Sequence, residues 1–228
     1  MVHGWAAVLL AFCICGCGMR YGPALYDTNI PAPVPFSPNV HGGYAAADVS
    51  RGDGFNDGER TTSVRGHYMV ADGEGMLRWS YGGFLYGGSY RIQENMNDRL
   101  RGPREFGGLG AEADVSFSEQ FGGVAIGGGV YAAVGLELAP YALLWDMRGY
   151  LPHLAAAGAY VTVGTPMGGQ AQGLALQLGL GMPGLVTLNG QIALDDVIIW
   201  GGLGASLDTY PRIGNLRRVG IGMALNIW

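Results

Sequence analysis

The chain has few charged residues and no lysine. Only 14% of its 228 residues are charged, all thirteen basic residues are arginine, and the formal net charge is -5. This composition lacks the basic surface with which proteins neutralise nucleic-acid phosphates, so we expect no nucleic-acid partner. The few cysteines and histidines show no zinc-ligand spacing, and we predict no metal site and no cofactor.

The sequence offers no good candidate for a membrane-spanning helix. The apolar run Trp5–Ile14 is shorter than the roughly 20 residues that such a helix needs, but it suits the core of a signal peptide. The segment 149–194 contains no Asp, Glu, Lys or Arg, yet Pro152, Pro166 and Pro183 interrupt it. A soluble domain would seldom leave so long a stretch uncharged, and these prolines exclude a continuous helix.

Glycine is abundant, with 42 residues, beside 49% hydrophobic residues. No Gly-X-Y period occurs, which excludes collagen. From Val40 onward the dominant period is two, which is typical of strands. In the clearest case, leucines at 174, 176, 178 and 180 alternate with small or polar residues, a turn follows at Gly181–Gly184, and 186–194 alternates again, which predicts a hairpin.

Alternation of this kind, separated by Gly, Pro or Asp turns, indicates ten or eleven strands of about ten residues. The segment Val40–Val49 is the uncertain additional strand. Because bacterial membrane barrels have even strand numbers and spans of about 9 to 11 residues, we favour 10 or 12 strands. We therefore predict an all-β fold, an antiparallel up-and-down transmembrane β-barrel formed by residues 40–228.

Charged residues in the first half of this region occupy the face opposite the apolar one. Lipid excludes charge whereas a barrel lumen tolerates it, so we predict that these residues face the lumen. If 61–70, 76–85 and 107–117 are neighbouring strands, opposite charges would meet there. Later strands present Gly, Ala, Gln and Asn inward, which favours a plugged lumen. The predicted lumen cluster comprises Arg65, His67, Arg78, Glu112 and Asp114.

Aromatic residues near the predicted strand ends suit two positions, an interfacial girdle or packed core. These residues are Trp79, Tyr81, Tyr86, Tyr141, Trp145, Tyr160, Trp200 and Tyr210.

The segment Ile14-Cys15-Gly16-Cys17 resembles the lipobox of bacterial lipoproteins, in which a small residue precedes the cysteine that is lipidated. Cys17 alone follows a small residue, since Phe12 precedes Cys13 and Ile14 precedes Cys15. The resemblance implies a signal peptide over 1–16 and a lipid such as palmitate on Cys17, with no second cysteine left for a disulfide. An ordinary signal peptide or an uncleaved anchor is the alternative.

Prolines follow Cys17 closely, with five between Met19 and Asn39, and favour extended, polyproline-like backbone. We interpret 17–39 as a tether; a strand-like arm against the domain is the alternative. The barrel pattern and the aromatic last residue, Trp228, resemble outer-membrane β-barrels of Gram-negative bacteria. This resemblance implies location in the outer membrane with membrane lipid as a partner.

Two polar segments are candidate recognition loops. Arg91–Glu105 contains four arginines that suit phosphates of lipopolysaccharide or an acidic surface glycan; a solvated loop is the alternative. Arg51–Glu59 has oxygen ligands, but their spacing does not match a calcium loop.

A lipid-acting barrel enzyme would need His, Ser and an acid together, and nothing in the sequence places a serine beside His67 or His153. We therefore predict no catalytic residues and a non-enzymatic structural, surface-interaction or narrow-pore role. Two alternatives are such an enzyme and a lipid-anchored periplasmic β-sandwich or lipid-carrying barrel, which would have apolar side chains inward.

Overall fold

A computed structural model gives the fold of most of the region predicted as a barrel. It describes residues 42–53, 60–74, 76–92, 102–138, 153–165, 173–182, 185–194, 197–206 and 217–226. The predicted signal peptide, the lipidation residue Cys17, the proline-rich segment and Trp228 lie outside these ranges. Within the ranges, no helix is both long and apolar enough to cross a membrane.

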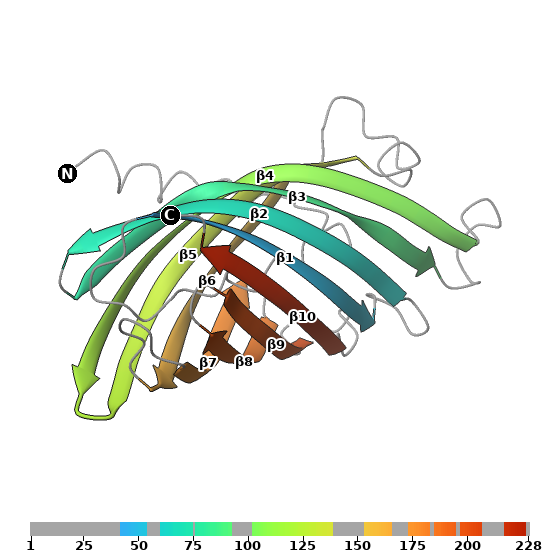
Figure 1. The fold of residues 1–228 in the computed structure, drawn as a ribbon. Helices are drawn as coiled ribbons and strands as arrows, with labels where there is room; N and C mark the ends of the chain where they lie inside the picture. Colours follow the sequence, from blue (N-terminus) through green and yellow to red (C-terminus); the bar gives the residue numbers. More distant parts are fainter. Residues whose placement is uncertain are drawn as a thin grey trace.

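Ten antiparallel strands form one closed barrel in which each strand pairs with its neighbours in sequence (Figure 1). The segment that was uncertain as a strand is β1, and its pairing with β10 closes the barrel. The strands are β1 Gly42–Asp53, β2 Arg60–Glu74, β3 Leu77–Ile92, β4 Gly102–Phe121, β5 Val124–Leu138, β6 His153–Gly164, β7 Gly173–Met182, β8 Leu185–Leu194, β9 Val197–Ser206 and β10 Arg217–Asn226.

The predicted strand length of about ten residues holds for β7 to β10, but β2 to β5 are longer, with 15, 16, 20 and 15 residues. Backbone pairing continues past the end of the apolar alternation, because ladder hydrogen bonds do not depend on side-chain polarity. The connection between β3 and β4 is therefore shorter than the predicted loop Arg91–Glu105. Strand β3 ends at Ile92, and β4 begins at Gly102.

The register of the ten ladders fixes the tilt of the strands. A path of directly paired residues that leaves β4 at Glu119 runs around the barrel and returns to β4 at Gly107, twelve residues earlier in the strand. A stagger of this size in a ten-stranded barrel corresponds to a tilt of roughly 40°. In Figure 1 the strands run obliquely around the barrel.

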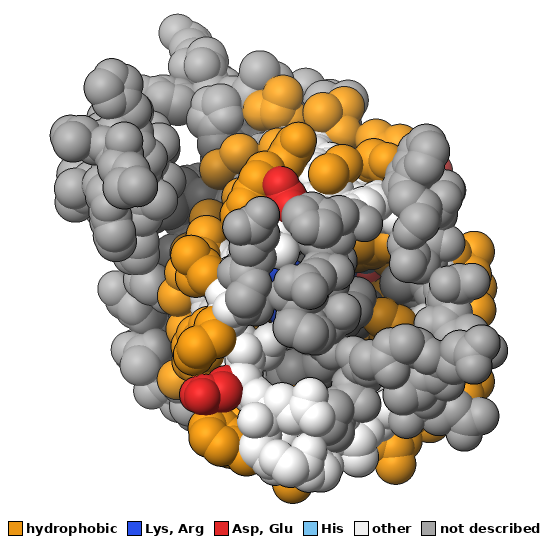
Figure 2. Space-filling view, turned by 60° about the vertical axis from the view of Figure 1, so that its left-hand side comes forward, with side chains coloured by type: hydrophobic (Ala, Val, Ile, Leu, Met, Phe, Trp, Pro, Cys, Tyr) orange, Lys and Arg blue, Asp and Glu red, His pale blue; other side chains and the backbone are white. Residues whose placement is uncertain are grey.

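Side chains alternate across the barrel wall along every strand. Most outward positions are apolar and exposed, as with Leu85 at 66% and Leu174 at 60%, while inward positions are small, polar or aromatic and are mostly buried. Figure 2 shows hydrophobic side chains spread over the outer surface of the described strands. This arrangement is the reverse of a soluble domain, in which exposed apolar area is limited.

The aromatic residues divide between the two predicted positions. Trp79 and Tyr81 lie outside and stack with ring centroids 5.4 Å apart. Tyr86, Tyr160 and Trp200 are buried inside. Tyr141, Trp145 and Tyr210 lie outside the described residues.

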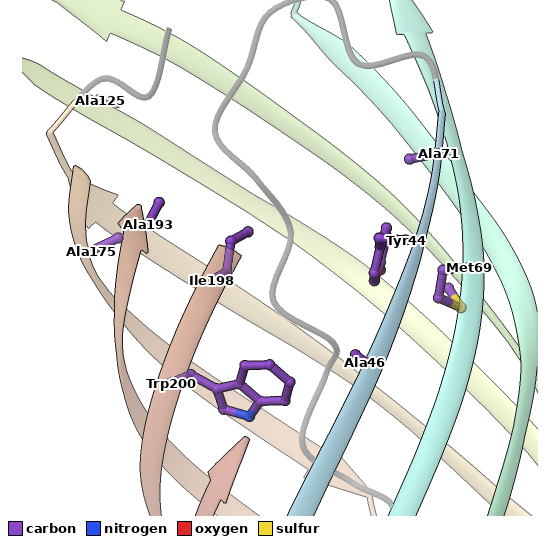
Figure 3. Close-up of a cluster of buried hydrophobic side chains, with 9 residues drawn as sticks. All are labelled: Tyr44, Ala46, Met69, Ala71, Ala125, Ala175, Ala193, Ile198 and Trp200. Carbon is purple, nitrogen blue, oxygen red and sulfur yellow. The ribbon is translucent and has the colours of Figure 1, made fainter. Parts of the chain in front are cut away.

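A small apolar cluster occupies one part of the interior. In Figure 3, Tyr44 and Met69 project from one wall, and Ile198 and Trp200 project from the facing wall. Alanines complete the cluster, so the bulk comes from four side chains. Its members are Tyr44, Ala46, Met69, Ala71, Ala125, Ala175, Ala193, Ile198 and Trp200.

The connections differ in length between the two ends of the barrel. We call the end of the barrel where β1 begins and β10 ends the turn end. Its connections are 75–76, 122–123, 165–172 and 195–196. Gly122 makes the β4–β5 turn with a φ of 60°, which favours glycine. We call the opposite end the loop end. Its connections are 54–59, 93–101, 139–152, 183–184 and 207–216.

Candidate functional site

The five residues of the predicted lumen cluster lie on three adjacent strands. Arg65 and His67 come from β2, Arg78 from β3, and Glu112 and Asp114 from β4. The pairing of β2 with β3 and of β3 with β4 matches the expected neighbours. Four of the five residues are at most 8% exposed, and the side chain of Glu112 is 11% exposed.

Arg65 makes its ion pair with a residue that the sequence did not single out. Its Nε atom donates a 2.8 Å hydrogen bond to Oδ2 of Asp48 on β1, and the two residues are direct Cα partners in the ladder. Both side chains are almost fully buried, at 3% and 4% exposure. Because a buried charge is costly unless it is paired, this contact stabilises both groups.

His67 contacts Glu112 across an intervening strand. Nδ1 of His67 lies 2.7 Å from Oε1 of Glu112, although β3 separates β2 from β4. Gly82 of β3 is the ladder partner of Glu112, and a Cβ atom there would meet the Met69 side chain and the Tyr68 carbonyl oxygen. The histidine side chain is completely buried, and no serine contributes to this pair, so it does not resemble a hydrolase site at a membrane interface.

Asp114 is bound by a tyrosine from two strands away. The Tyr160 hydroxyl on β6 donates a 2.8 Å hydrogen bond to Oδ2 of Asp114. Arg78 lies within electrostatic reach of both Asp114 and Tyr160, and of Tyr44 on β1. The structure therefore places four of the five predicted residues in three contacts, with Asp48 and Tyr160 as additional partners, and Arg78 lies near Asp114.

The charges inside the barrel nearly balance. Among the inward side chains that the structure describes, Asp48, Glu112 and Asp114 face Arg65 and Arg78, and His67 contacts Glu112. Within these residues, no group of three or more potential ligands is arranged to hold a metal ion.

Neutral polar pairs extend the packed interior away from the charges. Oγ of Ser50 lies 2.8 Å from Oγ of Ser63, and the Asn189 amide donates to Gln177 at 3.1 Å. These pairs and the charged contacts all lie inside the barrel. A sandwich or lipid-carrying barrel would have apolar side chains at these positions instead.

An apolar, exposed outer wall around a charge-paired polar interior defines a transmembrane β-barrel. No protein-family model and no curated protein matches the chain.

Several solved structures are similar to the chain over most of its length. An outer membrane channel from Pseudomonas putida F1 is 9% identical, with a TM-score of 0.46 over 86% of this chain and 100% of that one. The β domain of the Bordetella autotransporter BrkA is 11% identical, with a TM-score of 0.41 over 82% and 99%. Neisserial surface protein A is 9% identical, with a TM-score of 0.33 over 81% and 97%.

Proposed function

We propose that the protein is a non-enzymatic outer-membrane β-barrel lipoprotein whose lumen is sealed by its own side chains, and that it acts as a structural or surface-interaction protein. The observation that carries this proposal is the inversion of polarity across the wall. Exposed leucine and valine lie outside, and Asp48, Arg65 and Asp114 are buried inside. Only a surrounding of lipid makes such an exterior favourable.

The height of the apolar band supports a membrane location. On β2, the outward residues between Thr62 and Asp72 are Val64, Gly66, Tyr68 and Val70, none of them charged. Ten residues of strand rise roughly 33 Å, and a tilt of about 40° reduces this to about 25 Å along the barrel axis. Outer-membrane barrels have an apolar band of about 25 Å.

The two ends support one orientation. Outer-membrane barrels keep short turns on the periplasmic side and longer loops outside. The turn end would then face the periplasm and the loop end the cell exterior, where loops make contacts with partners. Lipidation of Cys17 is part of the proposal. A lipid there would add a second anchor, which the 17–39 segment would link to β1 on the periplasmic side.

The low exposure of the lumen residues favours a sealed barrel over a pore. A bilayer conductance measurement on the purified mature protein tests this. We expect no conductance steps from the native protein. A variant carrying Asp48→Ala, Arg65→Ala, His67→Ala and Glu112→Ala, which removes two complete contacts, should conduct. Stable steps from the native protein would contradict sealing and favour the second candidate.

That second candidate is a narrow pore. Polar side chains on β1, β2, β4, β7 and β8 provide a surface that water or ions can wet once a contact opens. Conductance by the native protein whose ion selectivity shifts towards anions when Asp48→Asn removes one negative lumen charge would establish it.

A further inference from the structure

A groove of about 770 Å³ runs over the outer wall of β6 to β10. Gly123, in the connection between β4 and β5, and Leu174, near the start of β7, also line it, so the groove reaches the turn end. Its sides are aliphatic side chains that are exposed on the outer wall, namely Val163, Leu174, Leu176, Ile192, Ile199 and Ile221.

Two neighbouring glycines form the floor of this groove. Gly190 of β8 and Gly201 of β9 are Cα partners, with Leu176 and Ile221 as the next residues of the same row on either side. Each glycine lies two residues from an exposed isoleucine, Ile192 or Ile199, so both occupy outward positions. The wall is therefore lowered at two adjacent positions between large aliphatic side chains.

The space above the two glycines is open. Among the described residues, a Cβ atom added to Gly190 would meet only Cδ2 of Leu176, at 3.7 Å. A Cβ atom added to Gly201 would meet only the carbonyl oxygen of Gly220, also at 3.7 Å. Both glycines therefore have room for a further group on their outward side.

The lining of the groove suits a hydrocarbon chain. Its exposed polar residue, Thr165, already accepts a 2.9 Å hydrogen bond from the Leu174 amide. Gln191 and Trp200 belong to the same stretch of wall, but their side chains are buried on its inner face. The groove thus offers mainly dispersion contacts with aliphatic groups and backbone, which an acyl chain can make along its whole length.

The chain's own lipid anchor can reach this groove. Strand β1 begins at Gly42 at the turn end, 25 positions after Cys17, and it pairs with β10, which supplies Ile221. Twenty-five residues extend to at most roughly 80 Å. Gly201 lies only one strand beyond β10, at about 4.8 Å per strand. A lipid on Cys17 would enter the turn-end leaflet, where the groove begins.

We propose that the groove binds an acyl chain of the lipid carried by Cys17, so that the anchor packs against the barrel wall. This proposal rests on the lipidation and the membrane location proposed above.

The test cross-links the anchor to the wall in intact membranes. Cells that express the full-length protein are grown with a palmitic acid that carries a photoreactive diazirine, and their outer membranes are irradiated. Mass spectrometry of the digested protein then identifies what the labelled chain has reached. We expect the Cys17 peptide joined through the acyl chain to peptides of β7 to β9 in the same molecule.

Filling the groove should prevent this cross-link. Gly190→Leu with Gly201→Leu places side chains where the acyl chain would lie, and we expect the yield to fall about tenfold, the loss of contact with about two methylene groups. Gly66→Leu is the matched control, because Gly66 lies outside the groove and a Cβ atom there meets nothing within 4 Å. Its yield should equal that of the native protein, and heat-modifiable mobility shows that each variant forms the barrel.

Two kinds of failure are distinguishable. Cys17 that carries the label but cross-links only to phospholipid, to a second copy of the chain or evenly to all strands would overturn docking while leaving lipidation intact. An unchanged yield in the groove-filled variant would do the same. Absence of label from Cys17 would refute lipidation, and the docking with it.

Discussion

Tyr160 reaches Asp114 by lying across Gly129 of the intervening strand. The Tyr160 hydroxyl donates to Asp114 at 2.8 Å, and a Cβ atom added to Gly129 would lie 2.7 Å from that hydroxyl and 2.8 Å from the Val115 carbonyl oxygen. Tyr131 lies against Gly158 in the same way. Glycine in these strands therefore makes room for large inward side chains to cross a neighbouring strand.

Replacing Gly129 should break this contact. In Gly129→Ala the new methyl group must displace Tyr160, because the backbone on its other side is fixed by the ladder. We expect a loss of about 1–3 kcal/mol in the free energy of unfolding, as for other overpacked interiors. Urea unfolding in detergent, followed by tryptophan fluorescence, measures it.

Gly66→Ala is the matched control, since a Cβ atom there meets nothing within 4 Å. It should leave stability unchanged or slightly raised. If both alanine variants unfold at the same urea concentration as the native protein, Gly129 has no role in seating Tyr160.

The buried ion pair between Asp48 and Arg65 should give unequal effects when its members are removed singly. Glu112 also lies within electrostatic reach of Arg65, so Arg65→Met leaves Asp48 without its cation and removes a favourable charge from near Glu112. We expect this variant to lose about 3–5 kcal/mol and Asp48→Asn to lose less. The double variant should lose less than the sum, as a double-mutant cycle would measure. Additive losses would mean that the pair contributes no coupling.

The sequence predicts the barrel because alternation is a local property. The leucines at 174, 176, 178 and 180 show on their own which face is apolar, and the structure exposes all four. The segment Val40–Val49 was ambiguous because its outward positions include Ala45 and Ala47 beside Val49, which gives weak contrast with the inward residues. It forms a strand by pairing with β10, a contact between the first and the last strand of the barrel.

The contacts inside the lumen depend on register, which a strand pattern does not contain. The sequence could predict inward charge on 61–70 and 107–117. The pairing of Arg65 with Asp48 could not be predicted, because it depends on the register in which β1 pairs with β2. Tyr160 could be assigned equally to a girdle or to the core, because both ends of a strand and its middle accept tyrosine. Tyr160 lies two residues before Thr162 on β6, so both side chains point to the same side of the wall, and both are buried. A polar residue at this spacing is the feature of the sequence that favours the interior for Tyr160.

Charge on the outer wall should be tolerated only near the edge of the band. Leu178 lies mid-strand on β7 and is 48% exposed, so Leu178→Arg should lose about 2–4 kcal/mol in a lipid bilayer. Thr62→Arg, at the edge, should lose no more than about 1 kcal/mol. Refolding equilibria into vesicles compare the two variants. Equal effects would mean that the wall does not face lipid.

Cys17→Ala tests the second anchor separately. Labelling with a radioactive fatty acid should disappear in this variant, while the barrel domain stays in the outer-membrane fraction with heat-modifiable mobility. Unchanged labelling would exclude Cys17 as the lipidation residue.

The most direct test compares two tryptophans on opposite sides of the wall. Trp79 is 43% exposed on the outer surface and Trp200 is 4% exposed inside. Two variants, each keeping one of these as its sole tryptophan, are folded into vesicles of phosphatidylcholine with brominated acyl chains. The account predicts strong quenching of Trp79 fluorescence and little quenching of Trp200. Quenching of Trp200 without quenching of Trp79 would contradict a membrane-spanning barrel with a lipid-facing outer wall.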